Sequence, residues 1–417
     1  MGPGEGARGV PATATALLTR RRLVPDFRGL PRPFWVLFGG TLVNRVGGFV
    51  IVFLAIYLTE VRGLNTAQAG AVISAYGLGA MGGGAFGGAV SDRVGRRPIL
   101  TLSLIGGGAS MLLLGLLTAT PAITGTALLT GFLYEMYRPV VSATIADVVA
   151  VADRPRAYGL IYWAVNLGAS IAPILGGVIA ARSYRALFVA DAATTALYGL
   201  IVLAALPETR PAAPPRPHGA PGAARAIVGD PVLLAACGLT FAFSIVFFQS
   251  FVGLPIDVRA HGVSAVGFGA LIAINGLLIV FLQPVAGELT RYRSRHSTLA
   301  AASLLLGAGL GMNAWVGSLG GYAVAVTIWT LGEILFAPAS QSLVADLAPT
   351  HLRGAYQGAF ALAFTSAFAA APAIGGYLLA HGGARWLWSA CLVTSMLVAA
   401  GFLMLGARVT LERRLED

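Results

Sequence analysis

Long apolar stretches separated by short polar gaps run along almost the whole chain. A helix needs about 20 apolar residues to cross a hydrocarbon core of about 30 Å. Because lipid cannot satisfy backbone polar groups, stretches of this length must be helices and not open strands. The pattern predicts an all-α integral membrane protein with twelve transmembrane helices, at 34–58, 68–90, 98–119, 123–149, 157–181, 185–206, 231–256, 265–289, 298–317, 321–347, 355–380 and 385–407.

The composition excludes several classes of protein. Of the 417 residues, 57% are apolar and only 11% are charged, whereas a soluble domain carries about 25% charged residues. A single soluble domain, a disulfide scaffold and a disordered chain are therefore excluded. Cys237 and Cys391 lie in separate apolar runs without metal-ligand spacing, and the chain has no nucleotide-binding loop, zinc pattern or catalytic triad. Neither an enzyme nor an ATP-driven pump is expected, and no metal or cofactor is predicted, which leaves an ion gradient or the substrate's own gradient as the energy source.

The net charge of +11 comes from 28 arginines, since the chain contains no lysine. With the N-terminus placed inside, 21 of them fall on the inner side, five on the outer side and two within helices. Arginine-rich loops are typical of the cytoplasmic face of a membrane, so both termini are predicted to be cytoplasmic. We expect a multi-pass protein of a bacterial inner (plasma) membrane, a monomer in the lipid bilayer, with no nucleic-acid partner.

The helices fall into two related sets of six. A proline-rich stretch at 207–230 is predicted to be a linker. It separates one bundle at 34–206 from a second bundle at 231–407. Tails at 1–33 and 408–417 flank the two bundles. Residues recur at offsets of 197 to 199 positions, which predicts a duplicated unit whose copies are related by an axis along the membrane normal. The recurring residues include Glu135 and Glu333, Pro139 and Pro338, Asp147 and Asp346, Arg156 and Arg353, and Pro173 and Pro372.

The loop after the second helix carries a specific pattern. Residues 88–97, Gly-Ala-Val-Ser-Asp-Arg-Val-Gly-Arg-Arg, resemble the loop signature of the major facilitator superfamily, in which the loop acts as a conformational switch. Asp92 is expected against the N-terminus of a helix from the other half, while Arg93 or Arg97 pairs with Asp147. The residues predicted for this switch are Gly88, Asp92, Arg93, Gly95, Arg96, Arg97 and Asp147, with Asp346 in the second copy.

The fifth helix carries a second pattern, at 168–177, that resembles the antiporter motif of the same superfamily. Its positions are Gly168, Pro173, Gly176 and Gly177, with Ala172 replacing one glycine of the motif. Small residues allow close helix packing in lipid. Segments 42–47, 134–139 and 332–338 are similar to bacterial multidrug exporters. The resemblance covers residues 34–407 and implies the major facilitator fold, with two pseudo-symmetric six-helix bundles and a secondary transporter of small molecules.

By this resemblance we expect a proton-coupled exporter of drugs or amphipathic secondary metabolites. Exporters or flippases of amphipathic lipids, and exporters of amino acids or short peptides, are the alternatives. A membrane sensor or enzyme is disfavoured, because sensing needs an appended soluble domain and catalysis needs clustered nucleophiles or metal ligands.

Five charged residues lie well within the predicted helices, away from their ends: Arg45, Glu135, Arg138, Asp191 and Glu333. A charge at mid-membrane costs about 2.5–3.5 kcal/mol on an insertion scale, so each needs a function or a partner. Their formal charges add to −1, so one carboxylate lacks a basic partner. We predict proton coupling by Glu333 and Glu135, which rank nearly level, with Asp191 third. A static ion-pair network of Arg45, Glu135 and Arg138, and a packing role for Asp191, are the alternatives.

Aromatic and polar side chains on the same helices are candidates for a substrate surface, because amphipathic or cationic molecules suit such cavities. The predicted cavity residues are Asn44, Arg45, Tyr134, Glu135, Arg138, Tyr162, Trp163, Asn166, Phe248, Gln249, Trp329, Glu333 and Phe364.

Overall fold

The computed structural model describes residues 29–210, 223–290 and 293–416, and all the regular secondary structure in these ranges is helical. The first half contains α1 (Arg32–Val46), α2 (Val50–Ile56), the π-helical turn η1 (Tyr57–Val61), α3 (Thr66–Val94), α4 (Arg96–Leu116), α5 (Thr120–Val148), η2 (Val151–Asp153), α6 (Arg154–Arg182) and α7 (Tyr184–Ala205). The second half contains α8 (Ala223–Gly229), α9 (Pro231–Phe247), η3 (Phe248–Phe251), α10 (Gly253–Ala260), α11 (Ala265–Thr290), α12 (Arg295–Gly311), η4 (Met312–Ala314), α13 (Leu319–Leu347) and α14 (Arg353–Glu416).

Twelve membrane spans follow from these helices. Within the described residues, ten helical stretches are long and apolar enough to cross a membrane. One of them, at 353–408, contains two predicted spans that meet at Gly383, whose φ of 76° interrupts α14. The remaining span is α5, a helix of 29 residues that carries Glu135 and Arg138. The predicted all-α fold with twelve transmembrane helices is confirmed.

The first and seventh spans are broken at equivalent places. The first is interrupted between α1 and α2, at Gly47–Phe49, and the seventh passes through the 3-10 turn η3 before α10. Backbone groups freed by such breaks need partners inside a membrane, so broken spans are tolerated only where protein or a cavity satisfies them. Both breaks lie beside the cavity described below.

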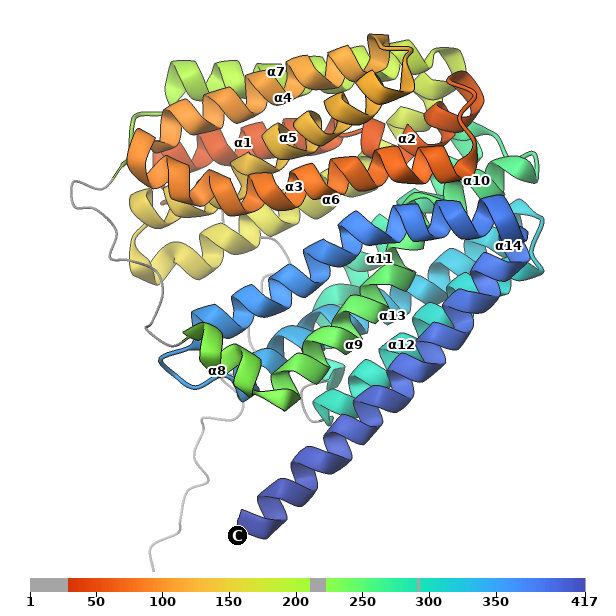
Figure 1. Cartoon of the computed structure of the whole chain (residues 1–417). Coiled ribbons are helices and arrows are strands. Elements are labelled where there is room, and N and C mark those ends of the chain that lie inside the picture. Colours follow the sequence, from red (N-terminus) through yellow and green to blue (C-terminus); the bar gives the residue numbers. More distant parts are fainter. Residues whose placement is uncertain (1–28, 211–222, 291–292, 417) are drawn as a thin grey trace, which may run out of the picture.

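The spans form two bundles, the first built from α1–α7 and the second from α9–α14 (Figure 1). The bundles meet through two pairs of helices, α3 with α14 and α6 with α11. We call the end that carries η1 and α10 the closed end, and the end that carries the α3–α4 loop the open end. Toward the open end the two bundles diverge (Figure 1).

Hydrogen bonds and an ion pair join the bundles near the closed end. The Thr66 hydroxyl donates to the Gly376 carbonyl at 3.1 Å, and the backbone N–H of Ala373 donates to the Ser74 hydroxyl at 2.9 Å. At the surface, Arg259 of α10 binds both carboxylate oxygens of Glu60 in η1, at 2.6 and 3.1 Å. The molecule therefore adopts a state in which one end of the interface is sealed.

The two helix contacts at the interface repeat each other. In α3, Gly70 packs on Pro372 and Gly376 of α14, and in α11, Gly269 packs on Pro173 and Gly177 of α6. A methyl group at Gly70 would lie 3.0 Å from the Pro372 carbonyl carbon, and one at Gly269 would lie 3.0 Å from that of Pro173. Every equivalent pair of positions is 199 residues apart. The predicted pseudo-symmetry is confirmed in three dimensions.

The segments outside the bundles differ in part from the expectation. Most of the tail at 1–33 and the centre of the linker at 207–230 lie outside the described residues. At its end, however, the linker forms the short helix α8, whose Ala226 and Ile227 pack against an apolar cluster around Leu233 and Val344. This part of the linker, Ala-Ala-Arg-Ala-Ile-Val, contains no proline, which permits a helix. The tail at 408–417 likewise continues α14 as far as Glu416.

Candidate functional site

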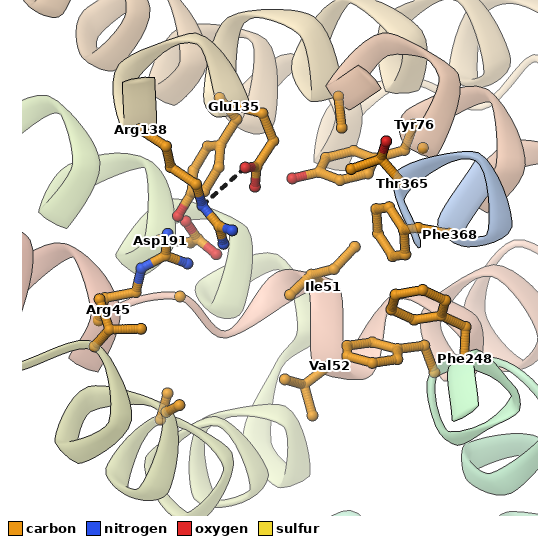
Figure 2. Close-up of a pocket in the computed structure, with 18 of the residues that line it drawn as sticks. Arg45, Ile51, Val52, Tyr76, Glu135, Arg138, Asp191, Phe248, Thr365 and Phe368 are labelled. Carbon is orange, nitrogen blue, oxygen red and sulfur yellow. Dashed lines mark ion pairs between the residues drawn. The ribbon is translucent and has the colours of Figure 1, made fainter. Parts of the chain in front are cut away.

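A cavity of about 400 Å³ lies between the two bundles, beside the break in the first span. Its lining divides into two chemically different sides (Figure 2). The first bundle contributes charged side chains from α1, α5 and α7, while η3 and α14 of the second bundle contribute phenylalanines. The lining residues are Arg45, Gly48, Ile51, Val52, Tyr76, Gly77, Ala80, Met81, Met111, Tyr134, Glu135, Arg138, Val165, Ala169, Ala172, Pro173, Asp191, Phe248, Phe251, Ile272, Asn275, Phe364, Thr365 and Phe368.

The charged side is a cluster of two acids and two bases. Arg138 binds Glu135 at 2.8 Å across one turn of α5, and its side chain is 55% exposed. Arg45, in the last turn of α1, donates to the Tyr137 hydroxyl and lies 5.6 Å from the centre of that ring. With Asp191 included, the formal charges on this side cancel. Of the alternative ion-pair network of Arg45, Glu135 and Arg138, the structure therefore shows the Glu135–Arg138 pair, whereas Arg45 donates to Tyr137.

Asp191 supports the break in the first span. Its side chain comes from α7, and the residue is only 1% exposed. One carboxylate oxygen accepts the backbone N–H of Val50 at 3.0 Å, at the start of α2. Thr195 lies beside the other oxygen at 3.5 Å and also accepts from the Asn44 amide at 2.9 Å. These bonds give Asp191 a packing role, although it also lines the cavity.

Glu333 has different surroundings from Glu135, its counterpart in the duplication. It is half-buried in α13 and does not line the cavity. Its carboxylate accepts a hydrogen bond of 2.7 Å from the amide of Asn275 in α11. Within the described residues no ion pair to Glu333 is found. The unpartnered carboxylate predicted by counting charges is therefore the one on α13.

The structure brings together only some of the predicted cavity residues. Those that line the cavity are Arg45, Tyr134, Glu135, Arg138, Phe248 and Phe364, together with Asp191. The remaining predicted residues do not line the cavity: Asn44, Tyr162, Trp163, Asn166, Gln249, Trp329 and Glu333.

The predicted residues that do not line the cavity lie elsewhere in the two bundles. Asn44 is fully buried among α1, α5 and α7, and Gln249 donates to the carbonyls of Ile245 and Ala371. Trp329 is 3% exposed and packs on Gly309 and Phe247. On α6, Trp163 stacks on Phe38, and the Asn166 amide donates to the Tyr162 carbonyl. Tyr162 is 54% exposed and lies on α6 nearer the open end than Val165.

Several lining residues were missed by sequence reasoning. Tyr76 and Met81 come from α3, Asn275 from α11, and Phe368 from α14. Most of the predicted cavity residues lie on the first, fourth, seventh and tenth spans, whereas the helices at the bundle interface also reach the cavity. Glycines in α3 at the same face, such as Gly77 against Ala369, are the signal that could have indicated that interface.

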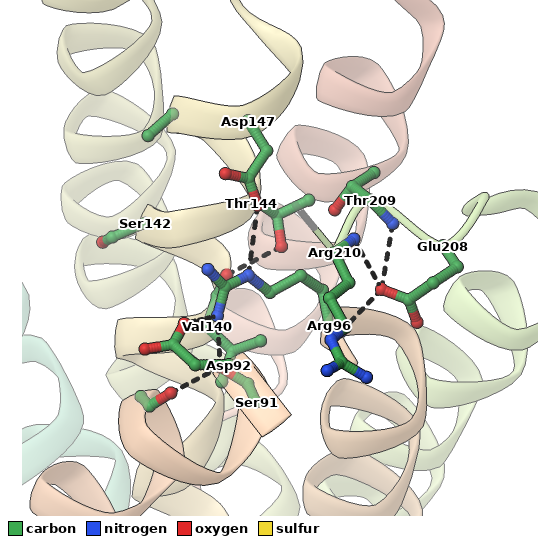
Figure 3. A network of polar contacts seen from close by, with 12 residues as sticks. Ser91, Asp92, Arg96, Val140, Ser142, Thr144, Asp147, Glu208, Thr209 and Arg210 are labelled. Atoms are coloured by element: carbon green, nitrogen blue, oxygen red, sulfur yellow. Dashed lines mark hydrogen bonds and ion pairs between the residues drawn. The ribbon is translucent and has the colours of Figure 1, made fainter. Parts of the chain in front are cut away.

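The predicted switch forms a polar network at the open end (Figure 3). Arg96, which is 5% exposed, binds Asp92 and the Ser91 hydroxyl, and pairs with Asp147 at 3.1 Å. The prediction that Arg93 or Arg97 pairs with Asp147 is wrong. Gly95 has a φ of 124°, and Arg96 directly follows this turn at the start of α4, with its guanidinium buried between α3 and α5. Arg93 is exposed, and Arg97 donates to the Leu203 carbonyl.

Asp92 also differs from the expectation, because its ion pair lies within its own bundle. The expected contact with a helix of the other half is not made in a state whose bundles diverge at this end. The N-terminus of α4 is instead capped by Glu208, which accepts from the backbone N–H groups of Arg96 at 2.8 Å and Arg97 at 3.2 Å. Glu208 begins the predicted linker, so its role in the network was missed.

The second copy of the switch keeps one part of this network. Arg295 at the start of α12 pairs with Asp346 near the end of α13 at 3.5 Å. Both residues lie 199 positions after their counterparts Arg96 and Asp147. An arginine that ties the start of one span to the end of the next is therefore common to both bundles.

The glycines of the predicted antiporter motif pack α6 against other helices. Gly168 lies against Arg45 of α1, Gly176 against Phe53 of α2, and Gly177 against Ala265 of α11. Pro173 lies inside α6 and contributes its carbonyl to the contact with Gly269. The motif thus holds both pieces of the broken first span and one side of the closed end.

Comparison with known proteins identifies the family. The model of the Major Facilitator Superfamily matches residues 37–372. The chain belongs to the major facilitator superfamily. A Na(+), Li(+), K(+)/H(+) antiporter of Planococcus maritimus is 27% identical over 88% of this chain and 94% of that protein. The multidrug resistance protein MdtH of Salmonella typhimurium is 24% identical over 85% of this chain and 86% of that protein.

Solved structures agree with the fold of this major facilitator protein. The nucleoside transporter NupG superposes with a TM-score of 0.78 at 13% identity, over 90% of this chain and 100% of that structure. A mutant of the peptide transporter POT, in complex with sulfate, gives a TM-score of 0.75 at 17% identity, over 92% of this chain and 97% of that structure. Such identities establish the fold alone. The relatives named here are transporters, and this major facilitator protein is a multi-pass membrane transporter of the secondary type.

Proposed function

We propose that this major facilitator protein is a proton-coupled antiporter that exports amphipathic organic molecules by alternating access. The observation that carries the proposal is the Glu333 carboxylate, which lies inside the membrane with a neutral amide as its hydrogen-bond donor. Burial disfavours a charged carboxylate that has no basic partner. Glu333 is therefore the group we assign to proton uptake and release during the cycle.

The orientation follows from the arginines. The open end carries the arginine-rich loops and is assigned to the cytoplasm, together with both termini, in a bacterial plasma membrane. The described state is then open to the inside and sealed on the outside. A substrate of an exporter enters in this state, and proton entry belongs to the opposite one.

The cavity supports an amphipathic substrate. Phe248, Phe364 and Phe368 form an apolar surface, while Glu135 and Arg138 offer charges of both signs on the facing side. A cationic substrate would compete with Arg138 for Glu135, and its apolar part would lie on the rings. Asp191 ranks third as a coupling residue, since its hydrogen bonds hold the break in the first span.

A second candidate function is exchange of alkali cations for protons. It is favoured by the Planococcus maritimus relative, whose name gives Na⁺, Li⁺ and K⁺ as its ions. The two functions share the proton-coupling residue and differ in the transported species.

Transport in proteoliposomes tests both functions. Purified protein is reconstituted, a pH gradient is imposed, and uptake of ethidium, tetraphenylphosphonium or alkali cations is measured. We expect gradient-driven accumulation of the organic cations by the wild type. Glu333→Gln should abolish gradient-driven accumulation and retain substrate exchange, because the variant cannot change its charge. Glu135→Gln should weaken substrate binding as well as coupling.

The matched control is Asp153→Asn, which removes an exposed carboxylate outside the cavity and should transport like the wild type. Undiminished gradient-driven accumulation in both glutamate variants would contradict the coupling assignment. Proton-driven movement of Na⁺, Li⁺ or K⁺ without movement of either organic cation would favour the second candidate.

A further inference from the structure

Asn275 connects the substrate cavity to the half-buried carboxylate of Glu333. Its side chain lines the cavity from α11, on the same face as Ile272. Its amide nitrogen donates to Glu333 at 2.7 Å and to the Thr330 hydroxyl at 3.1 Å, both in α13. Glu333 itself does not line the cavity. Any influence of the carboxylate on a bound substrate can therefore pass through this amide.

The orientation of the amide is fixed by its partners. The Thr330 hydroxyl donates to the Val326 carbonyl at 2.6 Å, so it can only accept from Asn275. An ionised Glu333 also only accepts. Both partners in α13 thus require N–H groups, and the amide oxygen of Asn275 is left for the cavity side. In this state the cavity wall offers a hydrogen-bond acceptor.

Protonation of Glu333 changes the hydrogen bonds that fix the Asn275 amide. The charge-assisted hydrogen bond from Asn275 becomes a weaker neutral one, and the carboxyl group gains an O–H that can donate to the amide oxygen. A rotated amide then satisfies Glu333 and presents its N–H groups to the cavity. Tyr162 of α6 is the titratable group of the facing bundle that interacts electrostatically with Glu333, and it carries no charge near neutral pH.

We propose that Asn275 is a positioning residue that converts the protonation state of Glu333 into the hydrogen-bonding character of the cavity wall. When Glu333 is ionised, the wall accepts a hydrogen bond and favours a substrate with an N–H donor, such as an organic amine. When Glu333 is protonated, the wall donates and disfavours the same substrate. Proton and amine therefore exclude each other without touching, which is the requirement for antiport. This inference rests on the proposed coupling function of Glu333.

Binding of two probe cations at a series of pH values tests the inference. Ethidium carries amino N–H donors, whereas tetraphenylphosphonium has none. In the wild type, acidification should weaken ethidium binding about fivefold more than tetraphenylphosphonium binding, which corresponds to one hydrogen bond. In Asn275→Leu this difference should disappear. Gln283→Leu is the matched control, because Gln283 also lies in α11 and donates to α13, at the Ile334 carbonyl; it should keep the wild-type difference.

The outcomes separate this inference from the proposed function. Suppose that Glu333→Gln loses gradient-driven transport while Asn275→Leu keeps the wild-type difference between the probes. That result would overturn the role of Asn275 alone. Intact gradient-driven transport in Glu333→Gln would overturn both. If Gln283→Leu lost the difference between the probes as fully as Asn275→Leu, the loss would be due to altered helix packing. The role of Asn275 would then also be overturned. If Asn275→Leu does not fold, Thr330→Val removes the acceptor that holds the amide, and it should reduce the same difference.

Discussion

A single methyl group at Gly70 should shift the molecule away from the described state. Gly70 faces backbone atoms of α14, and the added Cβ would lie 3.0 Å from the Pro372 carbonyl carbon and 3.2 Å from Cα of Gly376. Backbone atoms cannot rotate away as a flexible side chain can, so α3 and α14 must move apart. The clash exists only while the closed end is sealed. Gly70→Ala therefore penalises the described state and leaves a state with a separated closed end unaffected.

Overpacking of a close contact costs about 1–3 kcal/mol. That cost corresponds to a change of about 5- to 150-fold in the ratio of the two states. The equivalent substitution Gly269→Ala meets Pro173 and Gly177 of α6 in the same manner, so it should produce a shift in the same direction. Gly84→Ala is the control in α3, because Gly84 has nothing within 4 Å of a Cβ.

Spin-label distances measure the shift directly. The labels are placed in a background without Cys237 and Cys391, at exposed positions that are equivalent in the two halves. Val61 and Ala260 report on the closed end, and Val151 and Thr350 on the open end. In Gly70→Ala we expect the first distance to lengthen and the second to shorten in a larger fraction of molecules. Unchanged distance distributions in a folded Gly70→Ala protein would refute the argument that this contact seals the closed end.

Two further predictions concern the network at the open end. Asp92→Asn should insert and fold but transport more slowly than the wild type in the proteoliposome assay, because the charge paired with Arg96 is lost; a wild-type export rate would show that the pair has no part in the cycle. Arg96→Leu should lower the thermal unfolding temperature in detergent. The loss of unfolding free energy should be smaller than the about 3–5 kcal/mol of a fully buried pair, because the side chains of Asp92 and Asp147 are 29% and 18% exposed. Asp147→Asn in addition to Arg96→Leu should recover part of that loss.

The duplicated signatures could be predicted from the sequence because the same residues recur at a fixed separation in the two halves. Pro173 and Pro372 lie 199 residues apart, and so do the glycines that pack on them. A duplication preserves such contacts, so finding one copy locates the other. The Glu135–Arg138 pair could also be predicted, since residues three apart share a face of a helix.

The orientation of the aromatic rings could not be predicted in the same way. In a membrane helix both the lipid-facing and the buried side are apolar, so the hydrophobic pattern does not identify the face that meets a cavity. Trp329 and Phe368 illustrate the difficulty, because one packs on α12 and the other lines the cavity. Asn275 was missed for a related reason. The sequence does not show what a single amide in an apolar run contacts, and its partners Glu333 and Thr330 lie 58 and 55 positions later.

The divergence of the two glutamates after duplication is the basis of the proposed coupling. Glu135 kept a base on its own helix and faces the cavity, where Arg138 competes with a proton or a substrate for its carboxylate. Glu333 has no such base and lies behind Asn275, where only its protonation state can reach the substrate. A carboxylate that contacts the substrate directly changes affinity when it is neutralised, whereas one that acts through an amide changes how affinity depends on pH. The two substitutions should therefore differ in kind: Glu135→Gln weakens the binding of both probe cations wherever Glu135 is ionised, and Glu333→Gln removes the difference between the pH dependences of ethidium and tetraphenylphosphonium binding.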